Sequence, residues 1–439
     1  MTKRELLRQI KKHNIKFIDL WFSDLLGLIK NVAISVQELD RALENGIWFD
    51  GSSVEGFSRI WESDMFLKPD PDTFAIIPWQ SELAARFICD VYDSNYQPSP
   101  VDPRGLLKRQ LSDIAKQNMK FMVGAELEFY LFQREGTKIT PLLTDQVGYF
   151  DLDGDFALPF RKEMCEKIAE FGISVEAAHH EVGKSQHEID LKYCDALQMA
   201  DNILTAKIVI KRVAKENNLY ATFMPKPIFG MPGSGMHIHQ SIFKNGKNFF
   251  VDSSDSYGLS KFAYCYLAGI LHHIKEISAI ISPLVNSYKR LVSGFEAPVY
   301  ICWGRMNRSA LVRIPQVPKN RLHSTRLELR SIDPCINPYL AFSVILQAGM
   351  DGVKNNLKLP KPVEEDVYHL ESVDLMTKRI DVLPRSLLEA LEYYRTSKLV
   401  KQTFGETLFK RYYAIKQREW NEYSIHVSQW ELDKYLEIF

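Results

Sequence analysis

Two glutamates inside an apolar stretch constrain this chain most strongly. Glu126 and Glu128 lie in KFMVGAELEFYLF, residues 120–132, whose β-branched and aromatic content predicts a buried β-strand. Residues two apart on a strand point to the same face of a sheet, so both carboxylates face the same way. Neighbouring carboxylates repel each other and are costly to remove from water. The fold must therefore give this pair either a solvent-exposed sheet face or bound cations.

A second pair of glutamates is expected at a hairpin. The segments on either side of Gly183 in EAAHHEVGKSQHEID, residues 176–190, both have strand-like sequences. If Lys184–Ser185 is a two-residue turn, Glu181 and Glu188 face one another across the hairpin, on one face of the sheet. Opposed like charges destabilise a sheet unless something cationic lies between them. This hairpin is thus a second predicted cation site.

Histidines follow a strand pattern in GSGMHIHQS, residues 233–241. His237 and His239 are two apart and share a strand face. The Gly–Ser–Gly start allows the backbone to approach a ligand closely. In TRLELRSIDP, residues 325–334, the alternation likewise places Arg326, Glu328 and Arg330 on one face.

Together these segments favour a site for hard divalent cations. Five glutamates with one or two histidines, and no cysteine cluster, favour Mg²⁺ or Mn²⁺ over zinc. Two such ions bridging ATP phosphates would offset the carboxylate repulsion and polarise the transferred phosphoryl group. The segment 286–315 adds arginines, which suit bidentate capture of carboxylate and phosphate.

Composition narrows the class of protein. Lys plus Arg and Asp plus Glu each number 55, which argues against a general nucleic-acid or membrane-surface binder. The longest apolar stretch, near residues 262–274, is too short to span a membrane. Six scattered cysteines without a CxxC pair indicate a reduced protein, so we expect a cytoplasmic location.

The 439 residues are about three times a typical domain of ~150 residues. A helix at 3–13 and a strand hairpin precede a Pro-rich stretch at 93–104, which predicts a small α+β domain at 1–100. Beyond it, paired strands favour an antiparallel sheet over a doubly wound parallel one. Strand patterns lie at 121–132, 173–182, 186–191, 235–243 and 325–331. Helical patterns lie at 103–118, 159–171, 196–217, 258–280, 338–351, 384–397 and 405–422.

An ordered set of motifs resembles the glutamine synthetases of the bacterial and archaeal type I class, particularly their shorter, feedback-inhibited subgroup. The set spans nearly the whole chain. Its members are FDGSSVEGF (49–57), GAELEFYLF (124–132), HHEVGKSQHEID (179–190), FMPKPIFGMPGSGMH (223–237), NSYKRLVSGFEAP (286–298), NRSALVRIP (307–315) and RLELRSIDPCINPYLAF (326–342).

The resemblance implies an α+β architecture, with a β-grasp domain at 1–100 and a catalytic domain at 101–439 built on a curved antiparallel sheet flanked by helices. It implies ATP-dependent ligation of ammonia to the γ-carboxylate of L-glutamate through γ-glutamyl phosphate. It also implies a homododecamer of two stacked hexameric rings, with active sites shared between neighbours. A regulatory protein partner stays open.

Site residues are carried over motif by motif. At least two ions, Mg²⁺ or Mn²⁺, are implied, one held by Glu128, Glu181 and Glu188 and the other by Glu126, His237 and Glu328. Glutamate would contact Gly233, Arg290, Glu296, Arg308 and Arg330. ATP would contact Glu176, His239, Ser241, Arg308 and Arg313. Catalytic roles fall to Asp50, Glu296 and Arg308, with Asp50 reaching a neighbour's site, and Arg59 matches a position linked to feedback inhibition by glutamine.

The chain departs from the family pattern at two places. Lys184–Ser185 stands where members usually have Pro–Gly, and Pro232 where they often have Asn. Lys184 adds a cation near the metals.

Two other functions compete with this one. A ligase for a larger amine, such as a polyamine, tends to lose the acids of the ammonium pocket, whereas this chain keeps Asp50 and Glu296. A catalytically retired nitrogen sensor would not need its metal ligands, yet every metal-type position is filled.

Overall fold

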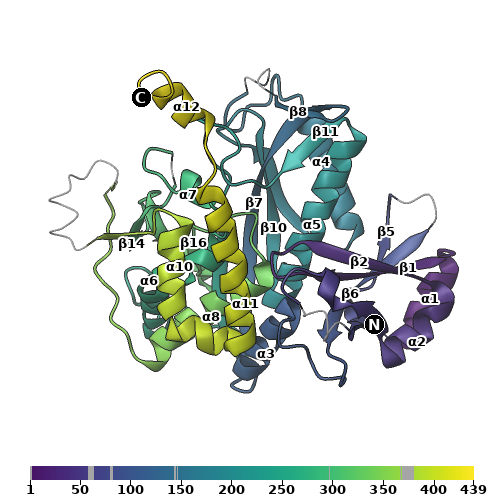
Figure 1. Cartoon of the computed structure of the whole chain (residues 1–439). Coiled ribbons are helices and arrows are strands. Elements are labelled where there is room, and N and C mark those ends of the chain that lie inside the picture. Colours follow the sequence, from purple (N-terminus) through teal and green to yellow (C-terminus); the bar gives the residue numbers. More distant parts are fainter. Residues whose placement is uncertain are drawn as a thin grey trace.

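A computed structural model describes residues 2–57, 64–79, 83–142, 145, 147–295, 297–365, 367 and 380–439 (Figure 1). Its strands form two sheets, one of six strands near the N-terminus and one of eleven strands beyond it. Helices from the middle and the C-terminal part of the chain pack around the larger sheet (Figure 1). This mixture of sheets and helices confirms the predicted α+β class.

The small sheet follows the predicted helix and hairpin. Helix α1 (Lys3–Lys12) begins at a capping box between Thr2 and Glu5. Strands β1 (Phe17–Ser23) and β2 (Ile29–Ser35) pair antiparallel, and β1 pairs parallel with β6. The sheet order is β2-β1-β6-β4-β3, with β5 pairing β6. The remaining elements are α2 (Leu39–Asn45), β3 (Ile47–Asp50), β4 (Asp64–Pro69), β5 (Ala75–Ile77) and β6 (Ala84–Tyr92).

The large sheet has the order β17-β14-β15-β16-β12-β7-β10-β9. All pairings along this path are antiparallel except β14 with β15, as the paired strand patterns predict. The strands of this sheet that were predicted from the sequence are β7 (Met119–Glu135), β9 (Val175–His180), β10 (Gln186–Asp195), β12 (Met236–Lys244) and β16 (Leu327–Leu329). The others are β8 (Lys138–Pro141), β11 (Leu219–Thr222), β13 (Lys247–Asn248), β14 (Tyr300–Gly304), β15 (Ala310–Arg313) and β17 (Asp381–Val382).

The seven helices predicted beyond the N-terminal region are all present. They are α3 (Pro103–Ala115), α4 (Leu158–Glu170), α5 (Ala196–Glu216), α6 (Lys261–Ile281), α8 (Pro338–Lys354), α10 (Leu387–Thr396) and α11 (Lys398–Ser424). Helix α11 starts earlier than predicted because it continues across a kink at Gly405, whose φ is 73°. Two short helices, α7 (Ser287–Arg290) and α12 (Gln429–Tyr435), were not predicted. None of the described helices is long and apolar enough to cross a membrane.

One buried arginine ties the small sheet to helix α5, which packs against β7 and β10 of the large sheet. Arg104 lies in the first turn of α3, where the Pro-rich stretch gives way to the helix. Its guanidinium donates to Asp70 and Asp90 of the N-terminal part at 2.9 and 2.6 Å. It also donates to Asp201 of α5 at 3.0 and 2.9 Å. Such charge-assisted bonds are the strong ones in proteins, so this contact holds the small sheet to α5.

The β9–β10 hairpin differs from its prediction. Glu188 pairs with His179 and His187 with His180, so residues 182–185 form a four-residue connection. Placing Glu181 directly opposite Glu188 was therefore wrong. Asp145 accepts hydrogen bonds from the backbone N–H of Ser185 at 3.0 Å and from its hydroxyl at 3.3 Å, which holds the wider turn. The register shift is two residues, so both glutamates still share one face.

Candidate active site

Strand register assembles the site on one face of the large sheet. Side chains at paired positions of adjacent strands point the same way, so a run of pairs builds a continuous polar face. The pairs are Glu188 with Glu128, Asp190 with Glu126, His237 with Glu126, His239 with Glu328, and Arg313 with Glu328. Five strands, from β10 to β15, thus contribute one charged layer.

The first metal-type cluster combines Glu126, His237 and Glu328, whose ligand atoms all lie within 4.8 Å of one another. Glu126 Oε2 is 2.8 Å from His237 Nδ1, and Glu126 Oε1 is 2.6 Å from His239 Nε2. Burial works against a charge on Glu126, but the hydrogen bonds from both imidazoles outweigh it and lower its pKa. Glu126 therefore stays ionised, as a cation ligand must.

The second cluster surrounds Glu188 on β10. Glu128, Glu181 and Glu188, predicted as one ligand set, all line one cavity of about 650 Å³. Glu188 Oε1 also lies 3.1 Å from His179 Nε2, and His179, Glu188 and Asp190 form a metal-type group. Burial and the neighbouring charge of Glu128 raise the pKa of Glu188. A cation bound here would offset that repulsion.

The same cavity has a basic side. Arg330 Nε and Arg313 Nη1 lie 3.2 and 3.1 Å from the two oxygens of Glu328, and Arg308 is exposed at the rim. Arg290 is buried and donates to Asp333 at 2.9 Å and to the carbonyls of residues 331 and 330. Arg290 thus lines the cavity with a guanidinium already bonded within its own chain.

Gly233 also lines this cavity, and its backbone packs tightly. A Cβ at Gly233 would lie 2.6 Å from the Pro225 carbonyl and 2.7 Å from Arg290 Cγ. A larger residue therefore has no room at this position without moving the loop.

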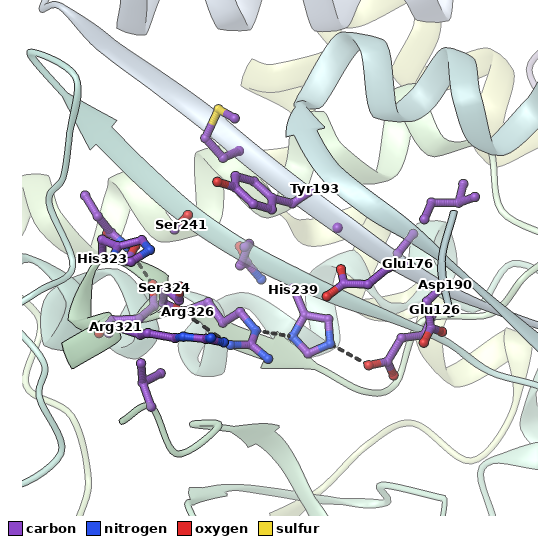
Figure 2. Close-up of a pocket in the computed structure, with 18 of the residues that line it drawn as sticks. Glu126, Glu176, Asp190, Tyr193, His239, Ser241, Arg321, His323, Ser324 and Arg326 are labelled. Atoms are coloured by element: carbon purple, nitrogen blue, oxygen red, sulfur yellow. Dashed lines mark hydrogen bonds and ion pairs between the residues drawn. The ribbon is translucent and has the colours of Figure 1, made fainter. Parts of the chain in front are cut away.

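A second cavity of about 500 Å³ adjoins the first along β12. Glu126 and Asp190 line both cavities. In Figure 2, His239 lies between Glu126 and Arg326, whose Nε is 3.1 Å from His239 Nδ1. The predicted ATP residues Glu176 and Ser241 also line this cavity, with Tyr193 between them and Arg321 and His323 at its far end (Figure 2).

One predicted residue, Asp50, stands apart from both cavities as the described residues line them. Asp50 is exposed at the end of β3, where its carboxylate accepts from the backbone and hydroxyl of Ser52 at 2.9 and 2.7 Å. Every described residue that lines either cavity lies beyond position 120. Glu296 and Arg59 lie outside the described residues.

The sequence predictions missed His179, Gln186 and Asp190. Asp190 follows Glu188 by two residues, so the strand period alone could have placed it on the same face. His179 needed the correct hairpin register, because it pairs with Glu188. Gln186 carries no charge, so a pattern of metal-ligating residues does not include it.

A third buried group lies behind this face. Asp145, His180 and His187 come together, but the Arg161 guanidinium contacts His187 Nδ1 at 3.1 Å. His180 Nε2 and Asp145 Oδ2 are 3.0 Å apart, and Arg161 is paired with Asp155 at 2.6 Å. The Arg161 guanidinium already supplies the positive charge in this group. We therefore describe it as a structural hydrogen-bond cluster.

Carboxylates suited to divalent cations, beside arginines suited to anionic substrates, define the class: a metal-assisted enzyme on an antiparallel sheet. Comparison with known proteins gives the family. Residues 14–94 match the glutamine synthetase β-Grasp domain, and residues 100–435 match the glutamine synthetase catalytic domain. The chain belongs to the glutamine synthetase family and is an enzyme of the glutamate–ammonia ligase type.

Relatives match along the full length. The glutamine synthetases of Clostridium saccharobutylicum and Methanosarcina mazei are 47% and 46% identical to it, each over 99% of this chain and 98% of the relative. The cryoEM structure of Plasmodium falciparum glutamine synthetase has a TM-score of 0.91 at 26% identity, covering 99% of both chains. A complex of GmaS with ADP has a TM-score of 0.90 at 30% identity, covering 98% of this chain and 99% of that one.

Proposed function

We propose that the two adjoining cavities make glutamine in two steps. The γ-phosphoryl group of ATP passes to a γ-carboxylate oxygen of glutamate, and ADP leaves. Ammonia then attacks the carbonyl carbon of the γ-glutamyl phosphate, the bond from that carbon to the phosphate oxygen breaks, and a proton is lost. The acyl phosphate reacts readily with water, so the site must be closed during the second step. The observation that carries this proposal is the metal-type cluster of Glu126, His237 and Glu328, because it lines the arginine-lined cavity while its Glu126 also lines the nucleotide-sized one.

The carboxylates fit a pair of divalent cations. Glu126, His237 and Glu328 would hold one, and Glu128, Glu181 and Glu188 the other. When bound, Mg²⁺ or Mn²⁺ supplies charge neutralisation and polarisation of the phosphoryl group. The raised pKa of Glu188 supports the fit, because burial beside Glu128 disfavours its charge without a cation.

The basic side of the first cavity would bind glutamate. Arg308 and Arg330 line this cavity and would bind the substrate carboxylates, and Gly233 lines the same cavity. Arg290 would act chiefly by holding this loop, since three of its five N–H donors already bond within the chain. Glu296 would complete the ammonium pocket.

The second cavity would bind ATP. Glu176, His239 and Ser241 line it, and Arg308 and Arg313 would reach the phosphates from the neighbouring cavity. His239 is held between Glu126 and Arg326, which sets its ring at the boundary of the two cavities (Figure 2).

We further propose that each chain consists of two domains, residues 1–100 and 101–439. Twelve chains would assemble as a homododecamer of two stacked hexameric rings. Asp50 is exposed and outside both cavities of its own chain, which supports its entry into a neighbour's site to receive the ammonium proton. The C-terminal end also exposes apolar side chains that a second copy would cover. They are Ile425, Val427, Trp430, Leu436, Ile438 and Phe439.

Regulation and location complete the proposal. Arg59 would mediate feedback inhibition by glutamine, as in the resembling subgroup. All six cysteines are free, which supports the reducing environment of the cytoplasm.

ADP release tests the reaction. We expect release that requires glutamate, ammonium and Mg²⁺ or Mn²⁺ together, with glutamine as the product. A panel of larger amines at equal concentration serves as the comparison. Faster turnover with a polyamine than with ammonium would contradict the assignment, as would no turnover under any of these conditions.

A further inference from the structure

Gln186 is a buried, uncharged residue in the middle of the charged face. It is the first residue of β10 and only 1% exposed. Its Nε2 donates to Glu128 Oε2 at 3.0 Å and to the Gly233 carbonyl at 3.1 Å. Its Oε1 accepts from the backbone N–H of Gly183 at 3.2 Å. Both amide hydrogens are therefore used on two different parts of the site.

These partners fix the orientation of the amide. A carboxylate and a carbonyl can only accept, so both must face the NH₂ group, and the N–H of Gly183 must face the oxygen. The reverse orientation would place acceptor against acceptor at two contacts. The neighbouring turn is itself held by Asp145 through Ser185, so Gln186 has little freedom to turn away.

The two oxygens of Glu128 consequently have different surroundings. Oε2 accepts from Gln186 and from the backbone N–H of Gly235 at 2.9 Å. Oε1 lies 4.0 Å from His237 Nε2, on the side of the first metal-type cluster, and Glu128 lines the cavity. Glu128 thus presents a single oxygen toward the place proposed for the cation. Partners of this kind orient metal ligands and tune their affinity.

We propose that Gln186 is a positioning residue that couples cation binding at Glu128 to glutamate binding at the Gly233 loop. The inference rests on the proposed roles of Glu128 and Gly233. One NH₂ group holds a cation ligand with one hydrogen and the substrate loop with the other, so moving either partner lengthens the bond to the other. Coupling of this kind is reciprocal: the cation tightens glutamate binding by the same factor as glutamate tightens cation binding.

Binding measurements on the assembled protein test this without turnover. Free Mn²⁺ is followed by its electron paramagnetic resonance signal, and glutamate affinity by calorimetry with and without saturating Mn²⁺. In Gln186→Met, which keeps bulk and loses both donors, we expect Mn²⁺ affinity to fall about tenfold. We also expect the factor by which Mn²⁺ tightens glutamate binding to fall toward one. Gln347→Met, at a half-buried glutamine bonded to Gln110 away from both cavities, is the matched control and should keep that factor.

Gln186→Glu gives a second measurement in the same volume. An added carboxylate repels the Gly233 carbonyl but supplies a further anion near the cation, so glutamate affinity should fall while Mn²⁺ affinity does not. If Gln186 only filled space, neither the glutamate affinity nor the factor by which Mn²⁺ tightens glutamate binding would change. Unchanged coupling in either folded variant, or a wild-type protein that binds both ligands without coupling, overturns the role of Gln186. A wild-type protein that binds neither Mn²⁺ nor glutamate contradicts the proposed function instead.

Discussion

At the scale of single residues, Glu328 has the most demanding surroundings in the site. It is 3% exposed, lies 3.7 Å from His237 Nδ1, and has an arginine beside each carboxylate oxygen. Arg313 and Arg330 place a positive charge beside this buried carboxylate without closing it off, because Glu328 still lines the cavity. Glu328 is therefore placed both to bind a cation and to orient Arg313 and Arg330.

Glu328→Ala should abolish turnover, with a loss of at least about 1,000-fold, and should weaken binding of divalent cations. The substitution removes one ligand and leaves Arg313 and Arg330 without their carboxylate, so the loss includes misplaced arginines. Steady-state ADP release and Mn²⁺ titration measure the two effects. Near-normal values for both would contradict the two-cation arrangement.

The contacts of His273 make the free energy of unfolding depend on pH. His273 of α6 is bonded to Glu276 at 3.0 Å and to Asp351 at 2.9 Å. Burial alone would lower the pKa of His273, but the two carboxylates outweigh it and raise that pKa. A raised pKa in the folded state means that this contact stabilises fully below the unfolded pKa of about 6.5, and loses that contribution as pH rises through the folded value.

His273→Gln should therefore cost more stability at pH 6 than at pH 9, by about 1 kcal/mol. Thermal unfolding of both proteins across this range measures the difference. His272→Gln, at the neighbouring position of the same helix, is the control. A melting-temperature difference that stays constant with pH would show that the imidazolium contributes nothing.

At the scale of elements, the sequence predicted strand identity well and register poorly. Period-two patterns placed Glu126, Glu128, His237 and Glu328 on their strands because alternation is local. The β9–β10 register depends on Asp145, which lies 40 positions before Ser185 and has no local signal. Short strands such as β14 and β15 were missed for the same reason: long-range pairing, rather than their own composition, defines them.

The turn at Ser185 gives an element-scale prediction. Ser185 has a φ of 60°, and its hydroxyl donates to the Leu142 carbonyl at 2.9 Å. Ser185→Ala should destabilise the protein by about 1–2 kcal/mol, because it loses that bond and keeps the unfavourable φ. Ser185→Gly should cost less, since glycine adopts this conformation freely. Equal melting temperatures for the two variants would show that backbone conformation is unimportant here.

At the scale of the whole molecule, the candidate site is incomplete within one chain if Asp50 takes part. Asp50 lies at the end of β3 in the small sheet, and the described residues of both cavities come from the rest of the chain. Repeated head-to-tail contacts in a ring can place one subunit's Asp50 over the next subunit's cations. The sequence suggested this arrangement only through the family resemblance, because a single chain carries no signal for its neighbour.

Mixing variants tests the shared site. Asp50→Ala and Glu328→Ala should each be nearly inactive alone. After dissociation, equal mixing and reassembly, roughly a quarter of the sites should regain an intact Asp50 and an intact Glu328. Crosslinked, unmixed proteins should stay inactive. Subunit exchange verified by mass without any return of activity would show that Asp50 acts within its own chain.

The buried hydrogen bonds of Arg104 would matter for a shared active site as well as for stability. Arg104 bonds Asp70 and Asp90 to Asp201, so the small sheet, whose strand β3 ends at Asp50, is held to helix α5 of its own chain. If Asp50 enters a neighbour's site in a ring, this contact would also set how one subunit presents Asp50 to the next. A substitution at Arg104 would then affect the adjacent subunit. In mixed rings, an Arg104 variant should slow turnover at active sites of neighbouring subunits that carry no substitution.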